Sequence, residues 1–128
     1  MTYDRMTDLS KVAEAVFQRD HQKLRPLLQR EAQLLNQLAR LDSQLAAVKA
    51  TSAQADGYHV TGTDLLWHSW ESATRRDLNT ELARLRSQKL AAMENLRGAF
   101  GRKQAVTNLA HRVQDHKRRA AQSRSQEA

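Results

Sequence analysis

Positively charged side chains near the C-terminus are the residues of this chain best suited to bind a partner. Residues 97–128 carry 8 basic and 2 acidic residues, whereas residues 1–63 carry 8 and 7, and residues 64–96 carry 5 and 5. We call residues 97–128 the basic end. Such a local excess of positive charge predicts an acidic protein surface or a nucleic acid as the partner. The candidate partner-binding cations are Arg97, Arg102, Lys103, Arg112, Lys117, Arg118 and Arg119, with Arg124 beyond them.

Three interpretations of the basic end follow from these residue types. Contacts with phosphates would be sensitive to salt, but a surface that stacks bases also needs aromatic side chains interleaved with the cations. The basic end lacks that interleaving. An acidic protein surface is therefore favoured over nucleic acid, and a solvated helix face with a frayed tail remains the third interpretation.

Aromatic residues in the middle of the chain form a second candidate binding site. Trp67 and Trp70 lie three residues apart beside Leu66. At helical spacing such a pair either closes the end of an interface between helices or anchors a partner protein. We assign Trp70 to the helix interface, and Trp67 with Tyr58 to partner binding.

The sequence contains no pattern typical of catalysis or metal binding. It has no cysteine, so disulfides, thiolate metal sites and cysteine nucleophiles are excluded. It also lacks a glycine-rich phosphate loop and a nucleophile elbow. No two histidines on one predicted helix have the i, i+4 spacing that would place two metal ligands on one face; the five are His21, His59, His68, His111 and His116. We therefore expect no enzymatic activity, no metal and no cofactor.

Heptad repeats predict the elements that position these residues. Two apolar series at a and d spacing in each half of the chain indicate coiled-coil packing. In the first half they are Leu24, Glu31, Leu38, Leu45 and Leu27, Leu34, Leu41, Val48. In the second half they are Leu78, Leu85, Ala92, Ala99, Val106, Val113 and Leu82, Lys89, Leu96, Lys103, Ala110. We call the surface formed by these a and d positions the seam.

The predicted fold is all-α, a single domain forming an elongated antiparallel two-helix coiled-coil hairpin. Its helices span about residues 9–51 and 64–120, joined by a connector at 52–63 that gathers glycine, serine, threonine and aspartate. Residues 1–8 and 122–128 are expected to be frayed. Thr7 or Asp8 is expected to cap the first helix, Gly57 to end it, and Thr63 or Asp64 to cap the second.

Two features interrupt the predicted helices. Pro26 removes a backbone hydrogen bond, so we expect a kink near it, or a new helix that begins there. Gly98 and Gly101 flank Phe100 and disfavour helix. They form a hinge, allow another backbone to approach closely, or make room for Phe17 and Phe100, and we favour the last.

Folding the hairpin about its connector predicts specific contacts between the helices. Phe17 should meet Phe100, and Leu38 should meet Leu78 or Leu82. Glu31 should approach Lys89, so that two charged residues in the seam form one ion pair; in the alternative, both side chains extend out of the seam into solvent.

The chain resembles FliJ-like proteins of flagellar and type III secretion systems, and the similarity covers most of it as an antiparallel two-helix coiled coil. The resemblance rests on Trp-His-Ser-Trp-Glu at 67–71, on Arg-Arg-Asp-Leu-Asn-Thr-Glu-Leu-Ala-Arg-Leu-Arg at 75–86, and on Ala-Phe-Gly-Arg-Lys-Gln-Ala at 99–105, followed by a basic end. It implies a stalk similar to the paired terminal helices of the rotary ATP synthase gamma subunit. The family inserts the paired chain ends into the pore of a hexameric export ATPase and also contacts the export gate and substrate chaperones. The chain is compact for this family, and Pro26, Gly98 and Gly101 interrupt its stalk pattern.

The resulting functional expectation is a non-enzymatic component of protein export that links an export ATPase to the export gate and chaperones. The alternatives are a nucleic-acid-binding helical protein and a generic coiled-coil adaptor. No run of 18 apolar residues and no apolar signal region at the N-terminus are present, so we expect a cytoplasmic protein that reaches membranes only through its partners. We expect a monomer when the chain is free of partners.

Overall fold

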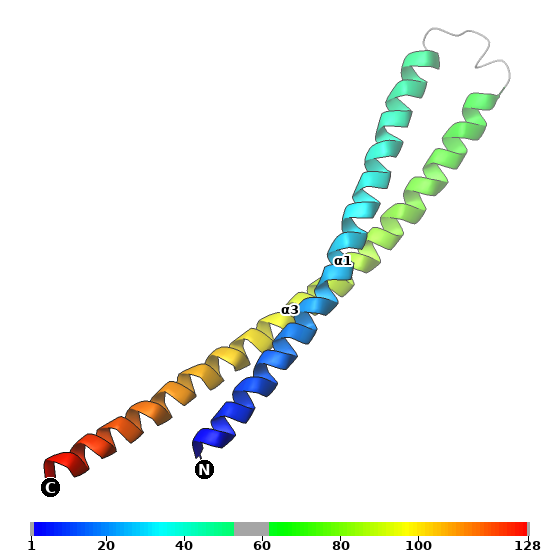
Figure 1. Ribbon diagram of the computed structural model, residues 1–128. Helices are drawn as coiled ribbons and strands as arrows, with labels where there is room; N and C mark the ends of the chain where they lie inside the picture. The colour runs from blue at the N-terminus through cyan, green and yellow to red at the C-terminus, as the bar shows by residue number, and fades with distance from the viewer. Residues whose placement is uncertain (1, 53–61, 128) are drawn as a thin grey trace. The chain divides into compact units, whose positions relative to one another are not determined.

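The fold is an all-α helical hairpin, as the heptad pattern predicts. The computed structural model describes residues 2–52 and 62–127, and these residues form two helices and contain no strand (Figure 1). Helix α1 spans Thr2–Ser52 and helix α3 spans Thr63–Glu127. Both helices contain long stretches without glycine or proline, in which one backbone hydrogen bond is gained for each residue added.

The chain divides into two compact units, each of which contains a length of both helices. One consists of Met1–Arg25 and Ala91–Ala128, and we call it the terminal unit. The other is Pro26–Leu90, and we call it the leucine unit. Within each unit α1 and α3 pack antiparallel, because residues later in α1 contact residues earlier in α3.

Leucine side chains form the core of the leucine unit. Leu34 is fully buried, and it packs with Leu82 and Leu85, which are 6% and 7% exposed. Leu27, Leu38 and Leu78 pack around these three. The predicted approach of Leu38 to this part of α3 is confirmed.

Smaller and more polar residues fill the seam of the terminal unit. Its fully buried apolar residues are Met6 and Ala99, and the ring centroids of Phe17 and Phe100 lie 6.0 Å apart. The predicted contact between these two rings is therefore confirmed. Alanine and methionine thus stand at buried positions here, where the leucine unit has leucine.

The heptad series are confirmed by burial. Every residue named in the four series is buried or half-buried. Five apolar residues outside the series are each a little under half exposed: Leu28 is 42% exposed, Leu35 43%, Met93 42%, Phe100 48% and Leu109 47%.

The predicted helix ends are wrong at both termini of the chain. Helix α1 begins at Thr2 instead of near Leu9, because the heptad continues backwards through Ala13 to Met6, which is 6% exposed. Helix α3 continues to Glu127 instead of ending near residue 120, through a segment rich in alanine, arginine and glutamine, which are good helix formers.

Pro26 lies inside α1, which continues through it. A helix that newly begins at Pro26 is therefore excluded, while the expected kink stays a prediction. Helix α3 follows Gly62, whose φ of 69° favours glycine and whose carbonyl accepts a 3.3 Å hydrogen bond from the Leu66 backbone N–H. The Gly62 carbonyl thus accepts the first bond of α3, the predicted capping by Thr63 or Asp64 stays a prediction, and Gly57 lies outside the described residues.

Gly98 and Gly101 do not make room for the phenylalanine rings, contrary to the favoured interpretation. A Cβ atom at Gly101 would meet nothing within 4 Å, and one at Gly98 would meet only the Arg102 side chain at 3.5 Å, an ordinary contact. Both glycines are exposed and lie outside the heptad series. Packing between α1 and α3 therefore does not require them.

Truncating the central leucine should destabilise the hairpin far more than truncating its neighbour. Leu34→Ala removes a fully buried side chain and should lower the free energy of unfolding by about 2–5 kcal/mol. Leu35→Ala is the matched control, since Leu35 is 43% exposed and should cost clearly less. Urea unfolding followed by circular dichroism measures both losses, and equal losses would contradict the assigned seam.

Replacing Gly98 or Gly101 with alanine should stabilise the protein. Gly98→Ala and Gly101→Ala each introduce a better helix former without a clash, so each should raise the free energy of unfolding by about 0.5–1 kcal/mol. Ala105→Gly, at an exposed position of the same helix, is the control and should lower it by a similar amount. Thermal unfolding reports the sign, and destabilisation by both alanines would show that the glycines are needed for packing.

Candidate functional site

The cations of the basic end do not share one role. Lys103 lies in the seam, where its Nζ is 2.7 Å from Glu14 Oε2 and 4.7 Å from the centroid of the Phe17 ring. Its charge is therefore engaged within the terminal unit. The structure places Lys103 among the residues that hold α1 and α3 together.

Arg97 and Arg102 lie beside the seam. The Arg97 side chain is 77% exposed and forms a 3.4 Å ion pair with Glu94, one turn earlier on α3. Such an exposed pair within one helix is weak. Arg102 is exposed and lines a hollow with Asp20, Lys23 and Gly98.

Helix α3 extends past the start of α1 within the terminal unit. Since Phe17 meets Phe100 and Glu14 meets Lys103, the first turn of α1 reaches the level of about Asp115 on the antiparallel partner. After Lys117, every residue through Glu127 is exposed except the half-buried Ala120. We call residues 118–127 the single-helix end.

The single-helix end carries cations without carboxylate partners among the described residues. Arg118, Arg119 and Arg124 are exposed, and no ion pair joins any of them to a described residue. Arg112, which precedes them on α3, is also exposed. These four and Arg102 are the predicted cations that are exposed and form no ion pair with a described residue, while Lys117 has an interaction within the protein.

Two buried carboxylates are absent from the residues that the sequence predicted to be functional. Asp20 is 7% exposed and lies within 3.4 Å of Arg19 nitrogens, and Glu71 is 6% exposed. Stepping the heptads back from Leu27 and Leu78 reaches both positions, so the sequence did carry the signal. Glu71 accepts a 2.6 Å hydrogen bond from Arg75, which also lies 2.8 Å from Asp42 of α1.

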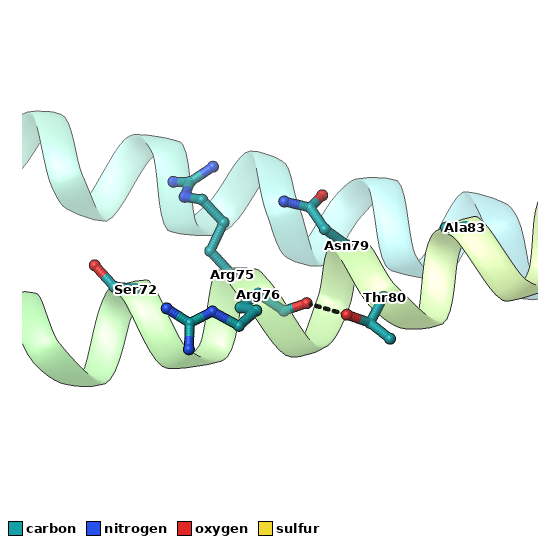
Figure 2. A pocket seen from close by; sticks show the side chains of 6 residues that line it. All are labelled: Ser72, Arg75, Arg76, Asn79, Thr80 and Ala83. Carbon is teal, nitrogen blue, oxygen red and sulfur yellow. Dashed lines mark hydrogen bonds between the residues drawn. The ribbon is translucent and has the colours of Figure 1, made fainter.

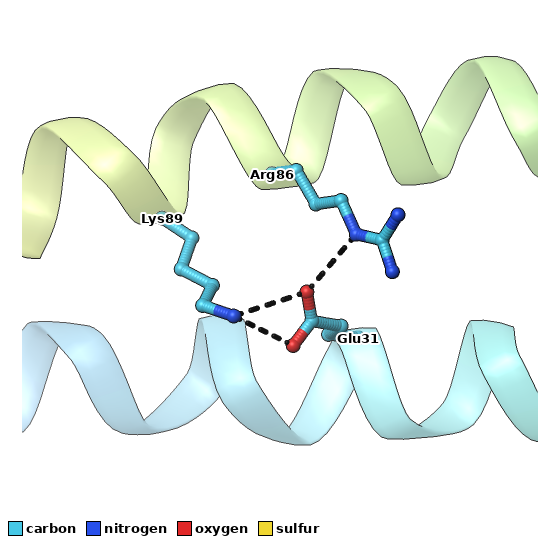
Figure 3. Close-up of polar contacts among 3 residues, drawn as sticks. All are labelled: Glu31, Arg86 and Lys89. Atoms are coloured by element: carbon cyan, nitrogen blue, oxygen red, sulfur yellow. Dashed lines mark hydrogen bonds and ion pairs between the residues drawn. The ribbon is translucent and has the colours of Figure 1, made fainter.

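The predicted ion pair between Glu31 and Lys89 is confirmed (Figure 3). Lys89 Nζ donates to both carboxylate oxygens at 3.0 and 3.3 Å, and Arg86 Nε donates to Oε2 at 3.3 Å. The hydrogen bond from Lys89, helped by the one from Arg86, lowers the pKa of Glu31 below its ordinary value of 4.5, against the opposing effect of burial.

Two further groups are stabilised in their charged forms by neighbours. Hydrogen bonds from Gln18 and Lys103 lower the pKa of Glu14. Hydrogen bonds to Glu71 and Asp42 raise the pKa of Arg75. Together with Glu31 and Lys89, these groups form a series of ion pairs along the seam and do not resemble a catalytic acid and base.

Trp70 does not lie in the seam as predicted, and the partner-binding role of Trp67 stays a prediction. Trp70 is 51% exposed, whereas Trp67 is half-buried, with its ring centroid 5.2 Å from that of His68 and 6.3 Å from that of Trp70. The heptad explains this, because stepping back from Leu78 places residue 71, not 70, in the seam. Tyr58, the other aromatic candidate, lies outside the described residues.

One hollow of the described surface lies on a single helix. The hollow between Ser72 and Ala83 is lined by α3 alone, with Arg75 directed towards α1 and the Thr80 hydroxyl donating to the Arg76 carbonyl at 2.8 Å (Figure 2). No cluster of three or more histidine, cysteine, aspartate or glutamate side chains suited to a metal ion occurs among the described residues. Within that part of the chain, neither helix contains a segment long and apolar enough to cross a bilayer.

Acidification should reveal the contribution of Glu31 to stability. Because folding lowers the pKa of Glu31, its stabilising effect is present above the ordinary value of 4.5 and is lost as the pH falls through the lower value of the folded state. The free energy of unfolding should thus fall between about pH 5 and pH 3, and less steeply in Glu31→Gln.

Urea unfolding across this pH range is the measurement. Glu127→Gln is the matched control, since it removes one carboxylate at an exposed position and leaves the pairs with Lys89 and Arg86 in place. Parallel profiles for wild type and Glu31→Gln would contradict the assigned role of the pair.

Comparisons with known proteins assign no family to this chain. No protein-family model, no curated protein and no solved structure matches it.

Proposed function

We propose that this chain is a non-enzymatic, FliJ-like component of a flagellar or type III protein export system that binds a hexameric export ATPase. One observation carries the proposal: α3 extends beyond α1 as a single helix with exposed arginines. In the proposed complex, the single-helix end enters an acidic or polar pore of the ATPase hexamer.

The single-helix end has the properties of a segment that needs a partner. A helix of about ten residues is marginal in water without tertiary contacts, and this one lacks an apolar face. A helix that is polar all round is stable where another molecule covers it or where ion pairs support it. Insertion into a pore would supply both the surrounding surface and the carboxylates that Arg118, Arg119 and Arg124 lack.

The distribution of charge supports an acidic partner at this end. The terminal unit contains 13 basic and 7 acidic residues, whereas the leucine unit contains 8 and 7. The start of α1 and the end of α3 both belong to the terminal unit, as expected for chain ends that enter a pore together. Complementary charge at such an interface speeds association and fixes orientation.

The proposed mechanism is mechanical and electrostatic. The basic end seats in the ATPase and promotes the assembly of its subunits, while the hairpin links nucleotide turnover to the export gate and to substrate chaperones. Its place of action is the cytoplasm, it reaches membranes only through these partners, and it is monomeric when free.

Removing the arginines of the single-helix end should weaken binding to the cognate export ATPase. The triple variant Arg118→Ala, Arg119→Ala and Arg124→Ala should bind the hexamer about tenfold or more weakly and lose stimulation of ATP hydrolysis, because it loses the complementary charge. Co-sedimentation and a hydrolysis assay measure these effects, and the wild-type affinity should fall with added salt.

The matched control removes three exposed arginines from the leucine unit, in Arg40→Ala, Arg76→Ala and Arg84→Ala, and should bind as wild type does. Absence of binding and stimulation by the wild-type protein would overturn the proposal. Salt-sensitive retardation of duplex DNA or RNA in a gel, weakened by the first triple variant alone, would instead support a nucleic-acid partner.

A further inference from the structure

An apolar groove runs between α1 and α3 on one side of the terminal unit. Phe17 and Leu24 line it from α1, and Met93, Leu96 and Phe100 line it from α3, with Arg97 at its edge. Met93 and Phe100 are 42% and 48% exposed, so the groove is open to solvent. Its volume is about 410 Å³.

The spacing of the groove residues matches a third helix. Phe17 and Leu24 are one heptad apart on α1, and Met93 and Phe100 are one heptad apart on α3. The groove thus repeats at the interval at which an amphipathic helix presents its own apolar side chains. Half-exposed aromatic and methionine side chains beside a closed seam are typical of such docking surfaces.

The charges around the groove favour an acidic occupant. Arg97 borders it with a 77% exposed side chain, and the exposed Arg25 follows Leu24. The nearby carboxylate of Glu14 is occupied by Lys103 at 2.7 Å. With 13 basic against 7 acidic residues in this unit, a second copy of the chain would bring like charges together, which opposes self-association here.

We infer that this groove binds an amphipathic α-helix of another protein that has an apolar stripe and an acidic flank, forming a local three-helix bundle. The stripe covers Phe100 and Met93, and the acidic flank pairs with Arg97 and Arg25. This surface is separate from the single-helix end and does not depend on the proposed export function.

The test uses a synthetic peptide of three heptads with leucine at the a and d positions and glutamate on its flanks. Fluorescence anisotropy of the labelled peptide should show binding to the full-length protein. Phe100→Ala and Met93→Gln should each weaken this binding about tenfold, and Arg97→Glu should do the same. Circular dichroism should show unchanged helix content for all three variants, because Met93 and Phe100 are nearly half exposed and Arg97 is 77% exposed.

Three controls test whether the peptide binds in the groove and through its charge. Leu109→Ala changes an apolar side chain of α3 that is 47% exposed and lies outside the groove, and it should bind as wild type does. The triple alanine variant of Arg118, Arg119 and Arg124 should also retain binding, which distinguishes this site from the single-helix end. A peptide with lysine in place of glutamate should bind about tenfold more weakly.

Several outcomes would overturn the inference. Equal binding of the glutamate and lysine peptides would contradict the preference for an acidic helix, and normal binding by Phe100→Ala and Met93→Gln would contradict binding in the groove. Loss of binding in the triple arginine variant alone would assign the peptide to the single-helix end. Sedimentation showing a wild-type dimer that Phe100→Ala dissociates would assign the groove to self-association.

Discussion

The seam of α3 carries a cation at every second heptad, and each of these side chains lies against carboxylates of α1. Arg75 reaches Asp42, Lys89 reaches Glu31, and Lys103 reaches Glu14. These cations alternate with apolar residues at Leu82 and Leu96. Sliding the helices by one heptad would place Lys89 against leucine and leave Glu31 without its partner. Apolar packing alone tolerates such a slip, whereas a half-buried charge without a partner does not.

The ion pairs therefore determine how α1 and α3 align more than they raise the free energy of unfolding. An ion pair at the edge of water adds little net free energy, because attraction is offset by the loss of hydration and side-chain freedom. The cost of a wrong alignment is larger, since it exposes apolar side chains and buries unmatched charges together. The lowered pKa of Glu31 reflects this matching of charges, and the lowered pKa of Glu14 reflects first a hydrogen bond from Gln18 and then the one from Lys103. A single alignment is what a binding surface built from both helices needs.

The sequence predicted the seam well because heptad spacing is a local property that each helix shows by itself. The same spacing, together with the position of the connector, was enough to pair Phe17 with Phe100 and Glu31 with Lys89. The predicted heptad repeat stops too early at the N-terminal end of α1. Met6 continues the repeat, although its polar neighbours indicate a frayed end. The prediction that Trp70 lies in the seam is wrong because its position falls outside the heptad repeat stepped back from Leu78.

The candidate sites were harder to predict because composition does not show which charges are engaged. Lys103 and Arg118 look equivalent in the sequence, but one pairs with Glu14 and the other lies beyond the start of α1. The difference depends on where α1 begins relative to α3, which only the paired structure shows. The groove was missed for the same reason, since Phe100 was assigned wholly to packing although nearly half of its surface is exposed.

The contrast between the two seams has a consequence for how the hairpin opens. Leu34, Leu82 and Leu85 close the leucine unit, whereas the terminal unit closes on Ala99, Met6 and a buried Asp20. The smaller and more polar side chains of the terminal unit favour a lower free energy for its local opening. Differences of this kind separate cooperative units within one chain. Backbone amides of the terminal unit should thus exchange with solvent sooner than those around Leu34. The ends of the chain can then separate and close again while the leucine core holds the two helices together.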